Sequence, residues 1–162
     1  MGLTGRKPKK PQKGALQPTF TTTAQVGFGD VDAAAIVFYP RYFVFLNTAI
    51  EQWFAQKLRV PFATFHIERK LGVPTVHLDV DFRSPFRLGD TVDIKLAITK
   101  VGSSSVALEF GFFSGSTLRL SGKVVLVCMS LASGKAVSWP ADVKARMKVS
   151  TVPWVASKPA RA

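Results

Sequence analysis

Two carboxylates, Asp30 and Asp32, stand in an otherwise apolar segment between residues 29 and 40. The segment ends at Pro40, which suits the first position of a helix because no N–H is needed there. A carboxylate can act as a nucleophile or as a general base. Spacing alone favours a turn role for Asp32, and Asp30 is interpreted as a structural residue that bonds loop amides.

The other residues that could act in catalysis or bind a metal lie far apart in the sequence. Glu51 follows Pro40 by eleven residues, about three turns along the same predicted helix, and is the second candidate carboxylate. His66 and His77 have no partner at a recognisable spacing. Cys128 is the only cysteine, which excludes an internal disulfide and a cysteine-based zinc cage. We expect neither a metal ion nor a cofactor.

The pattern of apolar residues predicts the elements that position these groups. Apolar residues at helical spacing predict one long, buried helix over residues 40–57. A β-prone, Thr-rich stretch predicts a first strand at residues 21–28. Alternation of apolar and polar residues predicts four more strands, each with one buried face, at residues 76–82, 92–98, 106–112 and 118–128. Gly122 suggests a bulge, residues 61–72 a short helix or loop, and Pro140 the start of a short helix.

This order of elements predicts an α+β fold in which an antiparallel sheet of five to six strands wraps around one long central helix. One helix cannot shield such a sheet alone. The uncovered surface and the sheet edges therefore predict a homodimer or homotetramer.

The net charge of +12 over 162 residues lies mostly at the two ends of the chain. Residues 1–20 carry +5, residues 141–162 carry +4, and the 120 residues between them only +3. We expect a basic tail at residues 1–19, a folded domain at residues 20–148 and a second tail at residues 149–162. No aromatic residue interleaves with the first basic run, so a nucleic-acid partner is disfavoured.

We expect no targeting signal in this sequence. The basic start leads into Pro11, Gln12 and Lys13 rather than an apolar segment, so it does not read as a secretory signal. No stretch approaches the roughly 20 apolar residues of a membrane span. We expect a cytoplasmic protein with no membrane partner.

The segment Gly29-Asp30-Val31-Asp32-Ala33-Ala34-Ala35-Ile36-Val37-Phe38-Tyr39-Pro40-Arg41-Tyr42 resembles the signature of the 4-hydroxybenzoyl-CoA thioesterase family. That signature reads Asp-x-Asp-Pro-Ala-Gly-Ile-Val-aromatic-Tyr-Pro-x-Tyr. Further matches are Glu51-Gln52-Trp53-Phe54, Gly72-Val73-Pro74 and the run from Pro85 to Asp90. The likeness covers roughly residues 20–148 and implies a hotdog fold.

The resemblance implies hydrolysis of an aromatic, 4-hydroxybenzoyl-like, or short- to medium-chain acyl-CoA. Asp32 then matches the catalytic carboxylate, as nucleophile or general base, and the backbone N–H of Tyr39 polarises the thioester carbonyl. A helix start stabilises an oxygen that gains negative charge, and apolar surroundings make a carboxylate more reactive. The substrate-binding residues implied are Ala35, Val37, Phe38, Lys100, Ser103, Ser104 and Ser105.

Two departures from the signature keep alternatives open. Its Pro and Gly are Ala33 and Ala35 here, and a glycine at the second position could supply a positive φ. The basic cluster that some members place at the turn of residues 102–104 is reduced to Lys100 nearby. The alternatives are a non-catalytic module that binds acyl thioesters and a thioesterase that acts on acyl carrier protein.

Overall fold

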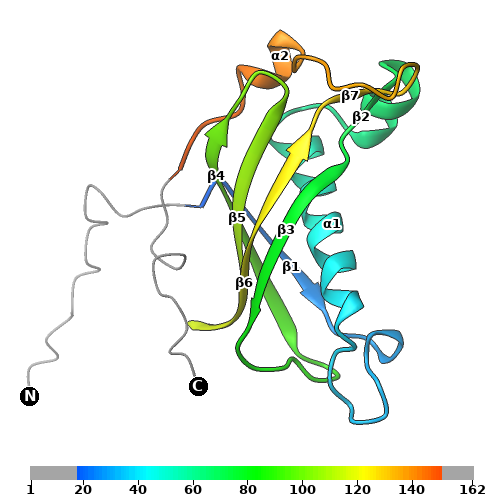
Figure 1. Ribbon diagram of the computed structural model, residues 1–162. Helices are drawn as coiled ribbons and strands as arrows, with labels where there is room; N and C mark the ends of the chain where they lie inside the picture. Colours follow the sequence, from blue (N-terminus) through cyan, green and yellow to red (C-terminus); the bar gives the residue numbers. More distant parts are fainter. Residues whose placement is uncertain (1–17, 151–162) are drawn as a thin grey trace, which may run out of the picture.

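A computed structural model describes residues 18–150 (Figure 1). The elements, in chain order, are β1 (Phe20–Gln25), the one-turn helix η1 (Phe28–Asp30), α1 (Pro40–Gln56), the π-helix η2 (Ala63–Glu68), β2 (Leu71–Gly72), β3 (Thr75–Phe82), β4 (Thr91–Val101), β5 (Ser105–Ser114), β6 (Thr117–Val127), β7 (Met129–Ser130) and α2 (Ala141–Lys144). The basic tails predicted at both ends lie almost wholly outside the described residues.

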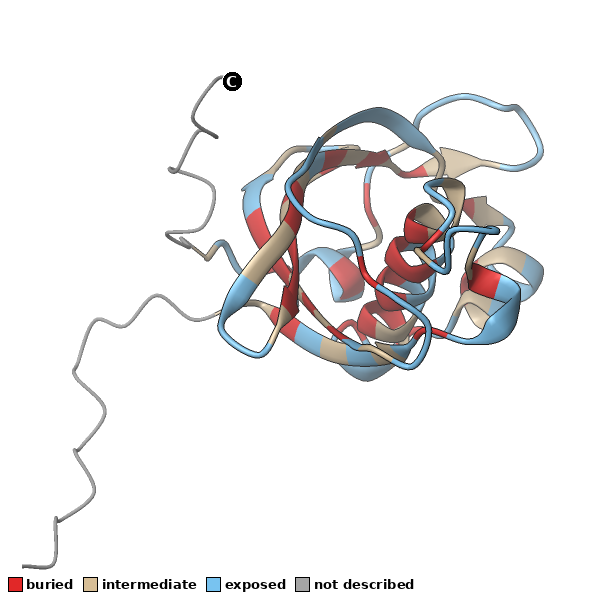
Figure 2. Cartoon of the chain, turned by 90° about the horizontal axis from the view of Figure 1, so that it is seen from below, coloured by how far each residue is buried: buried red, intermediate tan, exposed pale blue. Residues whose placement is uncertain are grey.

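The main sheet has five antiparallel strands in the order β1-β4-β5-β6-β3. It curves around α1, whose buried side lies inside the curve (Figure 2). The short strands β2 and β7 form a separate pair. The predicted α+β arrangement of a sheet around one long helix is therefore confirmed.

Helix α1 begins at the predicted residue, Pro40, and ends one residue earlier than predicted, at Gln56. Its buried residues are Tyr42, Phe45, Leu46, Ala49, Ile50, Trp53 and Phe54. Trp53 and Phe54 are completely buried, and burial of a large apolar side chain stabilises a fold by about 1.5–3 kcal/mol. The helix is held by this apolar stripe and not by its caps, because neither end has a side-chain cap.

Strand β3 differs from its prediction, because neither of its faces is buried. Every residue in it is exposed except Val80, which is half-buried. Val76 and Phe82 keep 59% and 54% of their surface exposed. The alternating pattern is present, yet β3 is the last strand of the sheet, and only Val80 and the Phe82 ring contact the rest of the described chain on its apolar face. The prediction of a buried face is wrong for the isolated chain.

Gly122 does not mark a bulge. It pairs in register with Val80 on one side and Phe110 on the other. A Cβ at this position would lie only 2.5 Å from the Phe110 ring and would also collide with the Asp79 carbonyl oxygen. Glycine is needed here because a neighbouring backbone and a ring approach closely.

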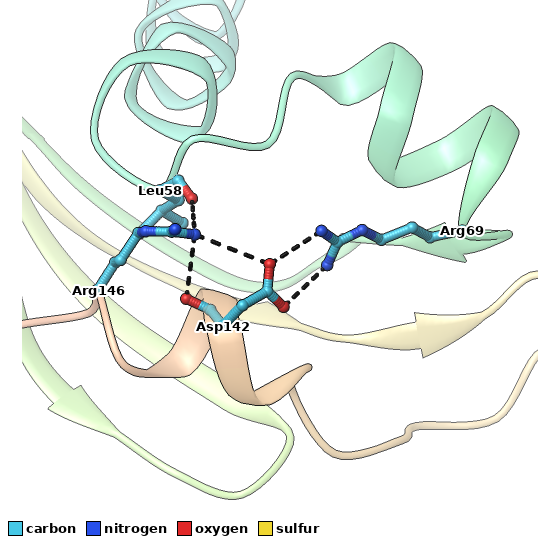
Figure 3. Close-up of polar contacts among 4 residues, drawn as sticks. All are labelled: Leu58, Arg69, Asp142 and Arg146. Atoms are coloured by element: carbon cyan, nitrogen blue, oxygen red, sulfur yellow. Dashed lines mark hydrogen bonds and ion pairs between the residues drawn. The ribbon is translucent and has the colours of Figure 1, made fainter.

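A polar network joins three segments at the C-terminal end of α1 (Figure 3). Arg69 donates two hydrogen bonds to the Asp142 carboxylate, at 3.0 and 2.9 Å. Arg146 lies 3.7 Å from the same carboxylate and donates to the Leu58 carbonyl. The network fastens α2 to η2 and to the end of α1.

Both ends of the described chain bond to one residue of β4. Ile98 donates its N–H to the Thr19 hydroxyl oxygen at 2.9 Å, and its carbonyl accepts the Ser150 N–H at 2.7 Å. The ordered fold thus reaches one or two residues beyond the predicted domain limits.

Candidate active site at the start of helix α1

Residues 31–38 form a tight loop before α1. Asp32 donates its N–H to the Ile36 carbonyl at 3.0 Å, and its own carbonyl accepts the Ala35 N–H at 2.9 Å. The Asp32 side chain accepts the Ala34 N–H through Oδ1, at 2.8 Å. The loop is therefore ordered by local hydrogen bonds around Asp32 itself.

The segment before β4 fixes this loop from outside. Val37 donates its N–H to the Phe86 carbonyl at 2.9 Å, and Leu88 donates to the Ala35 carbonyl at 3.3 Å. The run from Pro85 to Asp90, noted in the sequence only as a supporting match, thus positions the loop.

Ala35 has a φ of 59°. This left-handed conformation costs a residue with a Cβ roughly 1–2 kcal/mol, whereas glycine adopts it freely. A glycine at this signature position would therefore supply a positive φ, and Ala35 keeps that backbone shape at the cost of strain.

Asp30 is structural, as expected. It is only 8% exposed, and its Oδ2 accepts the Gly27 N–H at 2.9 Å. Its Oδ1 accepts Nε and Nη2 of Arg41, at 2.9 and 2.8 Å. Both carboxylate oxygens are thus occupied, which leaves Asp30 unsuited to attack or to proton transfer.

Asp32 has an open oxygen. Its Oδ2 has no hydrogen-bond partner among residues 18–150. The side chain is exposed, so the expected desolvation is not seen in a single chain. Of the two carboxylates, Asp32 is the one available for chemistry.

Tyr39 offers a free backbone donor at the start of α1. The Arg41 N–H bonds to the Phe38 carbonyl and the Tyr42 N–H to the Tyr39 carbonyl, while Pro40 has no N–H. Within the described part of the chain, the Tyr39 N–H has no acceptor. The helix start therefore presents one unused N–H together with its partial positive charge.

Tyr39 also lines a largely apolar cavity of about 290 Å³. Its lining includes Val37, Tyr39, Tyr42, Phe82 and Pro85. Val37 is buried and belongs to this lining, whereas Ala35 and Phe38 are exposed and lie outside it. Of the three acyl-site residues implied by the resemblance, the structure places only Val37 in this cavity.

Tyr42 brings a buried hydroxyl to the cavity, which sequence reasoning missed. The residue is 4% exposed, and its Oη accepts the Phe86 N–H at 3.1 Å. Burial raises the pKa of Tyr42 above its ordinary value of 10.0, so the phenol stays neutral at physiological pH. The only signal in the sequence was a hydroxyl-bearing side chain within the apolar stripe of the helix, which we interpreted mainly as core.

The remaining predicted site residues lie away from Asp32 in one chain. Ser103, Ser104 and Ser105 lie at or next to the far end of β4, whose 11 residues span roughly 30 Å at about 3.3 Å each. There the Ser103 and Ser104 carbonyls bind the N–H groups of Trp139 and Cys128.

Lys100 is exposed near the same end of β4. Glu51 is exposed on α1, about 16 Å along the helix from Pro40. Neither joins the Asp32 loop within one subunit.

The five-stranded antiparallel sheet wrapped around one long helix is the hotdog fold of thioesterases. A family model described as the thioesterase-like superfamily matches residues 26–147. The chain belongs to this superfamily and is an enzyme of the thioesterase class. None of the described helices is long and apolar enough to cross a membrane.

Similar proteins share this class. A 1,4-dihydroxy-2-naphthoyl-CoA hydrolase from Crocosphaera subtropica is 26% identical over 98 residues, which is 60% of this chain and 71% of the relative. An acyl-CoA thioesterase, YbgC, from Haemophilus influenzae is 23% identical over 80% of this chain and 95% of its own. The solved structure of a gentisyl-coenzyme A thioesterase has a TM-score of 0.70 and 30% identity, and the match covers 77% of this chain and 99% of that one.

Proposed function

We propose that the protein hydrolyses the thioester of an aromatic or short- to medium-chain acyl-CoA, with Asp32 as the catalytic carboxylate. One observation carries this proposal: a single hydrogen-bonded loop bears an open carboxylate oxygen near one end and the unused Tyr39 N–H at the other. Tyr39 also lines an apolar cavity. The thioester carbonyl oxygen would accept the Tyr39 N–H, which stabilises the negative charge that develops on attack.

Two routes for Asp32 are consistent with this arrangement. As a general base, Asp32 takes a proton from water while the water oxygen adds to the carbonyl carbon; the C–S bond then breaks and the thiolate takes the proton. As a nucleophile, Asp32 displaces the CoA thiolate to form a mixed anhydride, which water hydrolyses to the acid and free Asp32. Water is the co-reactant in both routes, and neither uses a cofactor.

The cavity favours an aromatic acyl group. Its lining includes three aromatic side chains, Tyr39, Tyr42 and Phe82, and its volume of about 290 Å³ exceeds that of a single substituted ring. The similar proteins named for naphthoyl and gentisyl thioesters point the same way. An acyl group on an acidic carrier protein remains the second candidate. The ends of this chain hold nine of its twelve net positive charges, which would attract such a carrier.

We also propose that two copies pair through β3. The uncovered apolar face of this edge strand includes Val76, Leu78 and Phe82. A two-fold axis would make the paired strands antiparallel, so the Thr75 end of one chain would meet the Phe82 end of the other. The turn Ser103–Ser105 of a second copy would then approach the cavity of the first, where Lys100 and the serine hydroxyls could hold CoA phosphates.

The test uses a panel of four thioesters: 4-hydroxybenzoyl-CoA, gentisyl-CoA, 1,4-dihydroxy-2-naphthoyl-CoA and octanoyl-CoA. Hydrolysis of each is measured through the free thiol that it releases. We expect turnover of at least one aryl thioester and a loss of about 1,000-fold in kcat for Asp32→Ala, with binding retained. Glu51→Ala, the matched control, should stay within threefold. Equal and negligible rates for wild type and Asp32→Ala, with CoA esters still bound, would instead indicate a binding module.

A cytoplasmic site of action fits the single, buried Cys128.

A further inference from the structure

Asp30 and Arg41 close a ring of hydrogen bonds around the peptide group that carries the candidate catalytic amide. The Asp30 carboxylate holds the Arg41 guanidinium through Nε and Nη2, at 2.9 and 2.8 Å. The Arg41 N–H donates to the Phe38 carbonyl at 2.8 Å, and the Phe38 N–H donates to the Asp30 carbonyl at 2.9 Å. Two residues thus fix Phe38 from both sides.

The Phe38 carbonyl and the Tyr39 N–H belong to the same planar peptide unit. In a trans peptide they point in opposite directions, so fixing the carbonyl also fixes the N–H. The bond from Arg41 to the Phe38 carbonyl therefore sets the direction in which the Tyr39 N–H points. The ion pair to Asp30 holds Arg41 from the other end.

The charge of Arg41 supports this role. A cation in the first turn of a helix opposes the helix dipole and destabilises the helix start. The Asp30 carboxylate offsets this destabilisation, since it is 88% buried as a side chain and lies 2.8 Å from Arg41. The Gly27 N–H bonds the second oxygen of the carboxylate, which anchors the pair to the end of β1.

We propose that the Asp30–Arg41 pair is a positioning device that aims the Tyr39 N–H at the thioester carbonyl oxygen. This inference rests on the function proposed above. A hydrogen-bond donor that already points at the reacting oxygen need not reorient when negative charge develops there. Breaking the Asp30–Arg41 pair should therefore weaken stabilisation of the transition state and lower kcat more than it raises KM. Neither side chain touches the reacting atoms, and the open carboxylate of Asp32 remains in place.

The test compares Arg41→Ala and Arg41→Lys with wild type on gentisyl-CoA, or on whichever aryl thioester of the panel turns over fastest. Arg41 is 40% exposed as a side chain, so its replacement should leave the fold intact. We expect kcat to fall about tenfold in Arg41→Ala, with KM within twofold, and Arg41→Lys to recover part of the loss. The matched control is Asp142→Asn, which breaks another Arg–Asp pair at the opposite end of α1 and should leave kcat within twofold.

A second readout does not depend on turnover. The ¹H–¹⁵N resonance of the Tyr39 amide should shift, and its hydrogen exchange should accelerate, in Arg41→Ala but not in Asp142→Asn. An unmoved Tyr39 resonance would overturn the positioning role even if the wild type hydrolysed no thioester. Wild-type kcat in Arg41→Ala, or a change confined to KM, would overturn it while leaving the proposed hydrolysis intact.

Discussion

Tyr42 accepts the backbone N–H of Phe86 at 3.1 Å, across 44 residues of chain. The bond joins the first turn of α1 to the segment that fixes the Asp32 loop, and Phe86 is completely buried. One phenol oxygen therefore links the helix start to the loop before β4, and it does so in the wall of the apolar cavity.

Replacing Tyr42 with Phe should destabilise the protein by about 1–3 kcal/mol, because the Phe86 N–H would be left buried without an acceptor. Urea unfolding followed by tryptophan fluorescence measures this change. Phe43→Leu, at a half-buried neighbouring position on α1, is the control and should cost less. A Tyr42→Phe protein as stable as wild type would show that the bond adds nothing to the fold.

Replacing Ala35 with Gly should stabilise the fold by about 0.5–1 kcal/mol, since relief of left-handed strain outweighs the added entropy of the unfolded chain. Ala33→Gly is the matched control in the same loop. Among the described residues only Ala35, Arg59 and Lys70 have positive φ without being glycine, so Ala33→Gly should instead destabilise. The same sign of change for both variants would contradict the account of Ala35.

The contribution of Glu109 to the free energy of unfolding should fall as pH rises. Burial raises the pKa of Glu109 above 4.5, against a smaller opposing effect of Lys123. The unfolded chain then releases this proton at a lower pH than the folded chain, so the contribution of Glu109 to stability decreases as pH rises above 4.5. Glu109→Gln should remove this decline.

Urea unfolding of wild type and Glu109→Gln at pH 4 and pH 7 measures the effect. The variant should gain stability relative to wild type on going to pH 7. The lost pair with Lys123 costs little, because Lys123 is 58% exposed as a side chain and the two charged atoms lie 3.8 Å apart. A relative loss of stability at pH 7 would show that the pair outweighs the burial.

Replacing Leu78 with Lys should separate the proposed dimer into monomers. Leu78 is 39% exposed in one chain, so the single subunit should remain folded while the paired β3 faces repel each other. Light scattering after size-exclusion chromatography gives the mass. Ile67→Lys, at an exposed apolar residue of η2, should leave the mass unchanged; a monomeric wild type would refute pairing through β3.

Local patterns predicted most of the architecture. The stripe from Tyr42 to Phe54 located α1 to within one residue, because the spacing of buried apolar residues is a property of the helix itself. The alternation of apolar and polar residues located β3 equally well. It wrongly predicted that one face of the strand is buried, because one chain supplies no surface that covers most of this face. Gly122 was misjudged because a close approach between strands leaves no local signature.

The site was predictable where it is continuous in sequence. Asp30, Asp32 and Tyr39 lie within ten residues, and the structure keeps them in one loop at a helix start. The bond between Tyr42 and Phe86 spans 44 residues and depends on tertiary packing, so no spacing could reveal it. The serines at the far end of β4 lie away from Asp32 in one chain, and only the proposed pairing through β3 would bring those of a second copy to this site.

The bonds of Ile98 to Thr19 and Ser150 place the two exits of the described fold side by side on β4. The sequence divides its charge excess between two ends that are far apart along the chain. Thr19 and Ser150 nevertheless bond to the same residue of β4. A circular permutant that joins residues 19 and 150 by a short linker and opens the chain between β5 and β6 should therefore keep the fold.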